Sequence, residues 1–379
     1  MALFMLPPVG GEGKTIRKTY GTFRNDLIRM QTCPTRLDVE SENIMQLNRR
    51  TVLQTMAALG ADRLLRAAEG PEKARRIDVH HHLFPPTYSA AIVTLGQPPS
   101  PKWTPAISLE EMDKSGISLS VLSLSPPNII FPDAAVARRL SREVNDYGAK
   151  MVRDYPNRFG LFVVLPLPDV DASLKEIEYG LDTLKADGIG LMTSYGDKWL
   201  GDAAFAPVWE ELNRRKSVVY THPHSADCCV GLKTSVGPGT IEWATDTTRT
   251  IASLLFTGAA ARYPDIRWIF SHGGGTMPFL LSRFQVDEKN RKDRDKVLPR
   301  GLMFELKKFY YDTAQANHPG ALAALLKIVT PAQMLFGTDY PYRTGAEVID
   351  GLAAQGFAAK DLLAIERENA LRLLPGLKG

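Results

Sequence analysis

Residues 77–82 read Ile-Asp-Val-His-His-His, a pattern typical of a short buried β-strand. Apolar and polar residues alternate in it, and Pro85-Pro86 stops the strand soon afterwards. Because side chains on a strand alternate between its two faces, His80 and His82 point to one side and His81 points to the other. Two neighbouring imidazoles can bind one divalent metal ion, but an isolated His-x-His pair fits a solvated histidine cluster equally well. The other ligands have to come from the rest of the chain.

Length and composition narrow the possible functions. The 379 residues suffice for one large α/β barrel or two average domains with a sizeable core. Residues 1–75 hold 12 Lys and Arg against 8 Asp and Glu, whereas the remaining residues hold 34 of each. The neutral body therefore has no basic face for nucleic acid, and no apolar run reaches the about 18 residues of a membrane span. The three cysteines (Cys33, Cys228 and Cys229) cannot form a disulfide framework.

Residues 1–75 are expected to form an N-terminal extension to a body that spans 76–379. The stretch Asn48-Arg-Arg-Thr-Val-Leu-Gln54 resembles a twin-arginine export signal, but Asp62-Arg63 interrupts the apolar segment that follows. The alternative is an amphipathic helix over about 49–68, which we favour together with a cytoplasmic location. A working signal around Arg49-Arg50 would instead place the protein in the periplasm.

Strand-like and helix-like stretches alternate throughout the body. Strands are expected at 75–83, 117–125, 160–166, 188–193, 217–223, 266–272, 309–314 and 333–339. Helices are expected at 108–113 (with Ser108 as N-cap), 133–154, 171–185, 203–215, 240–262 and 318–328. Apolar strand centres are typical of a parallel sheet covered by helices. Eight such strands predict a single (β/α)8 TIM-type barrel, and no Gly-rich dinucleotide motif follows the first strand to favour an open sheet.

Side chains of the kinds that bind metal ions recur at the C-terminal ends of these strands, where barrels carry their functional residues. His80 and His82 end the first strand, and His222 ends the fifth. His272 ends the sixth strand and Asp339 the eighth. Taken singly, either later histidine could be a core imidazole and Asp339 could be a turn residue. Together, five such residues at one barrel mouth predict a metal site.

The motifs resemble those of the amidohydrolase superfamily, in the branch that contains aminocarboxymuconate semialdehyde decarboxylase and the methylsalicylate- and resorcylate-type decarboxylases. The resemblance covers roughly residues 76–375. Its matching stretches are Ile77-Asp-Val-His-His-His82, Glu111-Met-Asp-Lys-Ser-Gly116, Thr221-His-Pro223, Phe270-Ser-His-Gly-Gly-Gly275, Phe309-Tyr-Tyr-Asp312 and Leu335-Phe-Gly-Thr-Asp-Tyr-Pro341. The Gly-Thr-Asp-Tyr-Pro and Ser-His-Gly-Gly-Gly motifs are the specific ones.

This resemblance implies a ligand set and a catalytic group. One divalent metal ion, zinc in most close relatives and manganese in others, would be bound by His80, His82, His222 and Asp339. Beside a metal-bound water, His272 would act as general base or acid, and no organic cofactor would be needed. Arg283 matches an arginine that reaches into the neighbouring subunit and binds a substrate carboxylate, which implies a homodimer or larger assembly.

The implied reaction is metal-dependent, non-oxidative decarboxylation of a small aromatic or muconate-like carboxylic acid. The segment Gly96–Lys102 lacks an arginine that the muconate-type enzyme carries there, so a salicylate- or resorcylate-type acid fits as well. Two alternatives use the same residues: hydrolysis of an amide, ester or lactone, and hydration. A non-catalytic binding barrel is a third.

Further substrate contacts are expected from loops near the barrel mouth. They are Trp103, Trp199 and His224, although a loop histidine can simply be solvated and large loop aromatics often only pack. His81, on the other face of the first strand, is expected to be structural.

Overall fold

The computed structural model describes residues 75–233 and 235–378, and the statements below concern these residues. The chain divides into two units, and all of the described residues belong to the second. The predicted helix over 49–68 and the Arg49-Arg50 motif lie outside the described residues. Within the described part of the chain, no helix is both long and apolar enough to cross a membrane.

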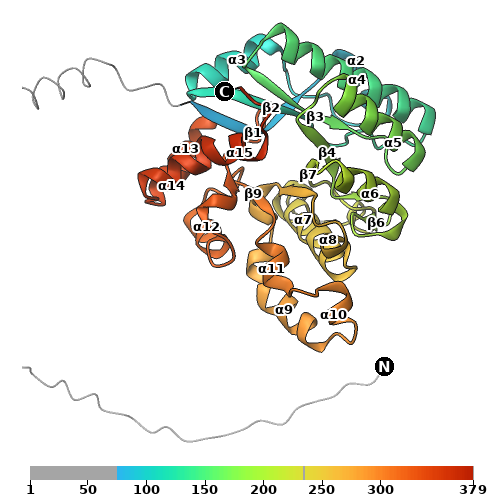
Figure 1. Cartoon of the computed structure of the whole chain (residues 1–379). Helices are drawn as coiled ribbons and strands as arrows, with labels where there is room; N and C mark the ends of the chain where they lie inside the picture. The colour runs from blue at the N-terminus through green and yellow to red at the C-terminus, as the bar shows by residue number, and fades with distance from the viewer. Residues whose placement is uncertain (1–74, 234, 379) are drawn as a thin grey trace, which may run out of the picture. The chain divides into compact units, whose positions relative to one another are not determined.

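Eight parallel strands form the centre of the second unit, in the hydrogen-bonded order β1-β2-β3-β4-β7-β8-β9-β10 (Figure 1). Their bounds are β1 Arg76–Leu83, β2 Ile117–Leu124, β3 Phe159–Val164, β4 Gly188–Met192, β7 Val218–His222, β8 Arg267–Phe270, β9 Tyr310–Asp312 and β10 Met334–Leu335. The segment after β10 pairs with β1, since Val79 N donates to Phe336 O (3.0 Å) and His82 N donates to Tyr340 O (2.8 Å). The sheet therefore closes, and the predicted (β/α)8 barrel is confirmed.

Two apolar cores hold the barrel together. The inner core contains side chains from the strand interiors, among them Phe162 and Tyr220, whose rings stack at 5.3 Å. Leu373 and Leu377 near the C-terminus pack against the same cluster and close the barrel floor. The larger outer core lies between the strands and the surrounding helices. Because both faces of the sheet are covered, its strands are almost wholly buried, as a parallel sheet requires.

Helices connect the strands and surround the barrel (Figure 1). Their bounds are α2 Pro86–Thr94, α3 Pro105–Lys114, α4 Ala134–Asp154, α5 Val170–Glu178, α6 Ala206–Arg214, α7 Pro238–Phe256, α8 Ala259–Arg262, α9 Met277–Asn290, α10 Arg294–Val297, α11 Leu302–Leu306, α12 Pro319–Leu325, α13 Gly345–Ala354, α14 Ala359–Leu363 and α15 Asn369–Leu373.

Three local features differ from the sequence expectations. Thr104, and not Ser108, caps α3 by accepting from Ile107 N (3.2 Å), so the N-cap prediction is wrong. The helix expected over 240–262 is split into α7 and α8 at Gly258, whose φ of +78° is left-handed. A short antiparallel hairpin, β5 Ser194–Tyr195 with β6 Lys198–Trp199, follows β4 and was not expected.

Candidate active site

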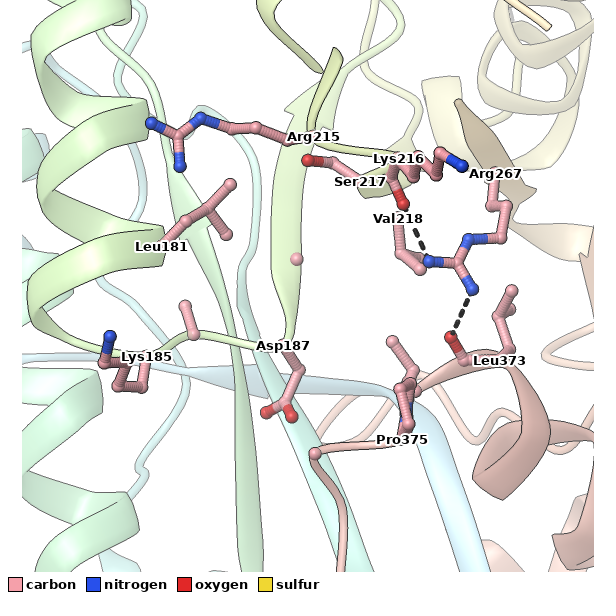
Figure 2. A pocket seen from close by; sticks show the side chains of 14 residues that line it. Leu181, Lys185, Asp187, Arg215, Lys216, Ser217, Val218, Arg267, Leu373 and Pro375 are labelled. Atoms are coloured by element: carbon pink, nitrogen blue, oxygen red, sulfur yellow. Dashed lines mark hydrogen bonds between the residues drawn. The ribbon is translucent and has the colours of Figure 1, made fainter. Parts of the chain in front are cut away.

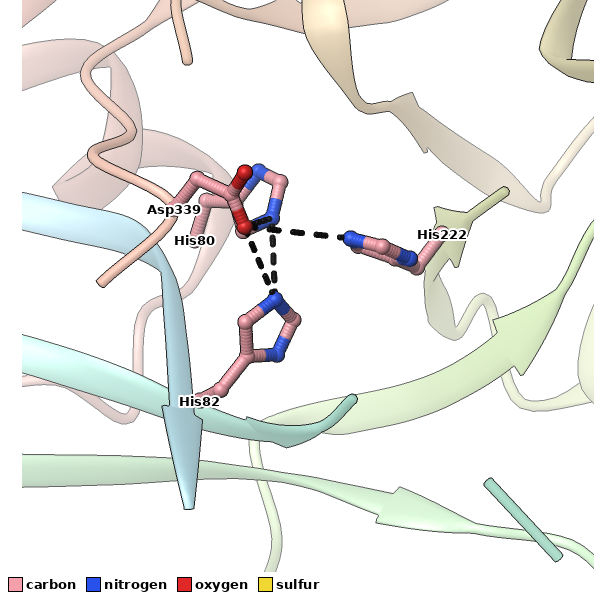
Figure 3. Close-up of side chains that lie close together, drawn as sticks. All are labelled: His80, His82, His222 and Asp339. Atoms are coloured by element: carbon pink, nitrogen blue, oxygen red, sulfur yellow. Dashed lines mark hydrogen bonds and ion pairs between the residues drawn. The ribbon is translucent and has the colours of Figure 1, made fainter. Parts of the chain in front are cut away.

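Four of the predicted metal-type side chains meet at the C-terminal mouth of the barrel (Figure 3). His80 and His82 come from β1, His222 from the end of β7 and Asp339 from the loop after β10. Asp339 Oδ1 lies 3.1 Å from the Nε2 atoms of both His80 and His82, and 3.9 Å from that of His222. The two Nε2 atoms from β1 are 3.2 Å apart. All four side chains are at most 2% exposed.

Each imidazole is oriented by an acceptor behind its Nδ1 atom. His80 Nδ1 donates to Asp312 Oδ2 at 2.8 Å. His82 Nδ1 donates to the carbonyl oxygen of Ser123 at 3.3 Å, and His222 Nδ1 donates to the carbonyl of the following proline at 2.8 Å. Because a carbonyl oxygen only accepts, Nδ1 carries the hydrogen and Nε2 turns its lone pair toward the shared centre.

This arrangement fits a divalent cation. Nitrogen lone pairs and a carboxylate oxygen that face one another at 3.1–3.2 Å repel unless a positive charge lies among them. The buried Nε2 of His222 has no hydrogen-bond partner among the described residues. Tetrahedral zinc, with Zn–N bonds of about 2.0–2.1 Å, would hold neighbouring ligand atoms about 3.3 Å apart, close to the observed separations.

The charges of the site support the same interpretation. Burial lowers the pKa of His80, but Asp312 and Asp339 outweigh burial and raise it to about 10. Burial raises the pKa of Asp339, but the facing imidazoles, His80 first, bring it well below its usual value. Burial lowers the pKa of His82 below its usual value and that of His222 to about 4. At neutral pH a metal ion would therefore displace a proton from His80 and find the other two imidazoles neutral.

His272 lies beside this cluster, directly after β8. Its ring centroid is 4.9 Å from that of His80 and 5.5 Å from that of His222. Nδ1 donates to the carbonyl of Ala314 (3.1 Å), whereas the buried Nε2 has no hydrogen-bond partner among the described residues. Burial lowers the pKa of His272 to about 4. The side chain is therefore neutral and can accept or deliver a proton through Nε2.

Two further residues orient the reactive groups. Asp312, fully buried at the end of β9, accepts from His80 and also from the backbone N–H groups of His272 (2.9 Å) and Ala314 (3.1 Å). The Gln315 side-chain amide donates to Asp339 Oδ2, which leaves Oδ1 facing the histidines. Asp312 thus links His80, a candidate metal ligand, to His272, the candidate proton carrier.

A cavity of about 780 Å³ adjoins the cluster and offers room for a small organic substrate. Trp243 on α7 lines it, and the Trp243 ring lies 5.9 Å from that of His222. The rest of the lining comprises Leu95, Gln97, Pro126, Pro127, Ile130, His224, Ser225, Asp227, Cys229, Val230, Leu232, Lys233, Val236, Pro238 and Glu242. Of the three predicted loop contacts, His224 therefore lies on the cavity wall.

The other predicted contacts lie elsewhere. Trp103 is 8% exposed and packs against Tyr147, with ring centroids 6.4 Å apart. Trp199 donates its indole N–H to Asp246 Oδ1 (2.7 Å). Neither ring is part of the cavity lining. Arg283 has an exposed side chain on α9, and it is also absent from this lining.

His81 has the structural role that its face of β1 suggested. Its Nδ1 lies 3.1 Å from Asp78 Oδ2, its Nε2 lies 2.7 Å from Ser108 Oγ, and its ring stacks on Tyr340 at 4.6 Å. Asp78 also accepts from the backbone and hydroxyl of Thr338. His81 and Asp78 thus fasten β1 to the loop that carries Asp339.

A second cavity, of about 350 Å³, lies at the opposite end of the barrel (Figure 2). Arg267 crosses its edge, donating to the carbonyl oxygens of Lys216 (2.7 Å) and Leu373 (3.4 Å). Asp187 accepts from Leu161 N (2.9 Å), and burial raises its pKa to about 6. Because this cavity lies at the N-terminal ends of the strands, it is separate from the histidine cluster.

Sequence reasoning missed several residues that shape the site. Asp312 stands at a strand end like Asp339, so the same rule of placement could have identified it. Gln315 follows three residues later and carries no comparable signal. Trp243 and Asp246 lie on a helix well after the fifth strand, and only the packing of α7 brings them to the mouth.

Known proteins are similar to this chain in sequence and in fold. A protein-family model described as Amidohydrolase matches residues 77–376. Decarboxylase yanB from Aspergillus niger is 36% identical over 327 residues, which cover 79% of this chain and 87% of that protein. The 6-methylsalicylic acid decarboxylase of Penicillium expansum is 34% identical, covering 80% and 97%. A dihydroxybenzoic acid decarboxylase from Polaromonas, solved with bound manganese, has the same fold, with a TM-score of 0.69, 20% identity and coverage of 80% and 98%.

Proposed function

Because the chain belongs to the amidohydrolase family, we propose that it is a metal-dependent decarboxylase of a small aromatic carboxylic acid. The observation that carries the proposal is the pairing of an intact His₃Asp cluster with a neutral histidine beside it. Relatives that match most of this chain are named decarboxylases, which favours CO2 release over hydrolysis or hydration.

The metal ligands in this proposal are His80, His82, His222 and Asp339. Three imidazoles and one carboxylate are a donor set that suits zinc, and manganese is the alternative. Bound there, the ion would act as a Lewis acid on a substrate oxygen. Asp312 and Gln315 hold two of the ligands in the required orientation.

His272 handles the proton. When the bond between the ring carbon and the carboxylate breaks, its electron pair stays on the ring carbon, a proton replaces the carboxylate there, and CO2 leaves. The unpartnered Nε2 of His272 can take this proton from a water molecule and bring it to the carbon, and the hydroxide left behind combines with CO2 as bicarbonate. Because burial keeps the pKa of His272 at about 4, the imidazolium gives up its proton readily once it has formed. Asp339 is the second catalytic residue of this proposal, and its Oδ1 faces His80 within the cluster.

Arg283 is proposed to reach into the active site of a second subunit and bind the carboxylate of the substrate there. The enzyme would then work as a homodimer or a larger assembly. Arg283 shares the outer surface of α9 with Phe279 (85% exposed) and Val286 (59% exposed). Large apolar side chains exposed on this scale on one helix are typical of an interface. A guanidinium group binds carboxylates in bidentate fashion, which suits this role.

The test is the release of CO2 from a panel of hydroxybenzoates, including 6-methylsalicylate and 2,6-dihydroxybenzoate, by enzyme loaded with zinc or manganese. We expect CO2 from at least one acid, and loss of the activity after treatment with a chelator. Hydrolysis of lactones or esters, without CO2 from any acid, would contradict the proposal.

A further inference from the structure

A buried carboxylate on α7 organises a hydrogen-bond network behind one wall of the large cavity. Asp246 is fully buried, and its carboxylate accepts from Thr193 Oγ1, Ser194 Oγ (3.2 Å) and Trp199 Nε1 (2.7 Å). Ser194 and Trp199 belong to the β5–β6 hairpin. Because three donors converge on one buried acceptor, the hairpin is fixed against α7 and the Ser194 hydroxyl has a defined direction.

Ser194 in turn orients the imidazole of His224. Nε2 of His224 lies 2.9 Å from the carbonyl oxygen of Ser194 and 2.9 Å from its Oγ. A carbonyl oxygen only accepts and the hydroxyl hydrogen is directed at Asp246, so the hydrogen must be on Nε2. Nδ1 therefore carries the lone pair, and it has no hydrogen-bond partner among the described residues.

The cavity around His224 suits an aromatic ring. Leu95, Ile130 and Trp243 contribute apolar surface to its lining. The polar side chains of Gln97 and Lys233, which also line it, are exposed to solvent. His224 is part-buried and lines the cavity, and because Ser194 engages Nε2, Nδ1 is the ring nitrogen left for a molecule in the cavity.

We infer that His224 is a specificity-determining residue, which accepts a hydrogen bond from a second phenolic hydroxyl group on the ring of the substrate, in addition to the hydroxyl ortho to the carboxylate. Ser194 and Asp246 are its positioning residues. The inference rests on the proposed function and narrows the substrate class to benzoates with a hydroxyl group at the ring position that faces His224. A methyl group of similar size cannot donate, so the methyl analogue leaves Nδ1 without a partner.

The experiment compares binding of acids that differ only in this group. Each of the 2,3-, 2,4-, 2,5- and 2,6-dihydroxybenzoates is paired with the salicylate that carries a methyl group at the second position. Dissociation constants are measured by calorimetry on full-length, zinc-loaded His272→Ala enzyme, so that turnover does not interfere. At one ring position we expect a hydroxyl preference that His224→Leu reduces by about two- to twelve-fold.

Three further variants separate positioning from general damage. His224→Gln, whose amide oxygen can accept, should recover part of the preference. Ser194→Ala should reduce the preference for hydroxyl over methyl without changing the affinity for the methyl analogue, because the substitution only makes the orientation of the His224 ring less fixed. Gln97→Ala, on the exposed part of the same cavity, should leave the ratio unchanged. Thermal unfolding curves confirm that each variant is folded.

The outcomes distinguish this inference from the proposed function. A hydroxyl-to-methyl ratio that His224→Leu leaves unchanged at all four positions overturns the inference alone. Binding with the expected ratios, but no CO2 release by the wild-type enzyme, overturns the proposed function alone. Failure of every acid to bind overturns both.

Discussion

Replacing Asp312 by asparagine should weaken metal binding by about 10- to 100-fold, although Asp312 touches no metal in the proposed site. Oδ1 of Asp312 accepts from two backbone N–H groups, those of His272 and Ala314, so an asparagine would place its oxygen there. Its NH2 group would then face the Nδ1–H of His80, where a carboxylate oxygen lies at 2.8 Å. Two donors cannot face each other, so His80 must move its hydrogen to Nε2 and lose the lone pair that would bind the metal.

The size of the effect follows from the bond that is lost. A hydrogen bond to a charged group contributes about 1.5–3 kcal/mol, which corresponds to roughly 12- to 160-fold in an equilibrium constant and agrees with the range above. The assay is equilibrium competition for zinc between the protein and a chromophoric chelator. Asp246→Asn is the matched control, because Asp246 is equally buried and accepts three hydrogen bonds without contacting the cluster. If Asp312→Asn binds zinc within two-fold of the wild type, the role assigned to Asp312 is wrong.

Three other changes test separate parts of the account. His272→Ala should abolish CO2 release while elemental analysis still finds close to one metal ion per chain; loss of the metal would make His272 a ligand. Arg283→Ala should raise KM about tenfold or more, and mixing it with His272→Ala subunits should restore activity, since each hybrid dimer has one intact site. No recovery would contradict a shared site. Asp187→Asn should raise the free energy of unfolding in urea by about 3 kcal/mol at pH 8 but only about 1 kcal/mol at pH 4.5. Burial raises the pKa of Asp187 to about 6, so the buried carboxylate destabilises the folded protein increasingly as the pH rises above the pKa that Asp187 has in the unfolded chain. Equal gains at both pH values would refute this.

The barrel could be predicted from the sequence because its strands are short, apolar and regularly spaced. The eighth strand shows the limit of that reasoning. Regular pairing with β9 covers only Met334–Leu335, although the expected strand ran to Asp339. A side chain at Gly337 would come within 2.9 Å of His80 Cβ, and Asp339 has a φ of +67°. The chain bends there to bring the carboxylate over the first strand, which apolar periodicity cannot reveal.

The candidate site could be predicted as far as it depends on strand ends. His80, His82, His222 and Asp339 meet because all four lie at or just after the C-terminal ends of parallel strands, which share one face of the barrel. The cavity wall depends instead on loops and on α7. A tryptophan on a loop has no sequence feature that tells whether it will contact a ligand or, like Trp199, donate to a buried carboxylate.

The most direct test of the account follows both products of one reaction. The metal-loaded enzyme is incubated in deuterium oxide with a hydroxybenzoate labelled with carbon-13 in its carboxyl group, and NMR records the products. We predict labelled bicarbonate in equal amount to a phenol that carries one deuterium at the former carboxyl position. Neither product should form with His272→Ala or after metal removal. Equal turnover by metal-free enzyme, or a product that keeps its labelled carboxyl carbon, would contradict metal-dependent decarboxylation.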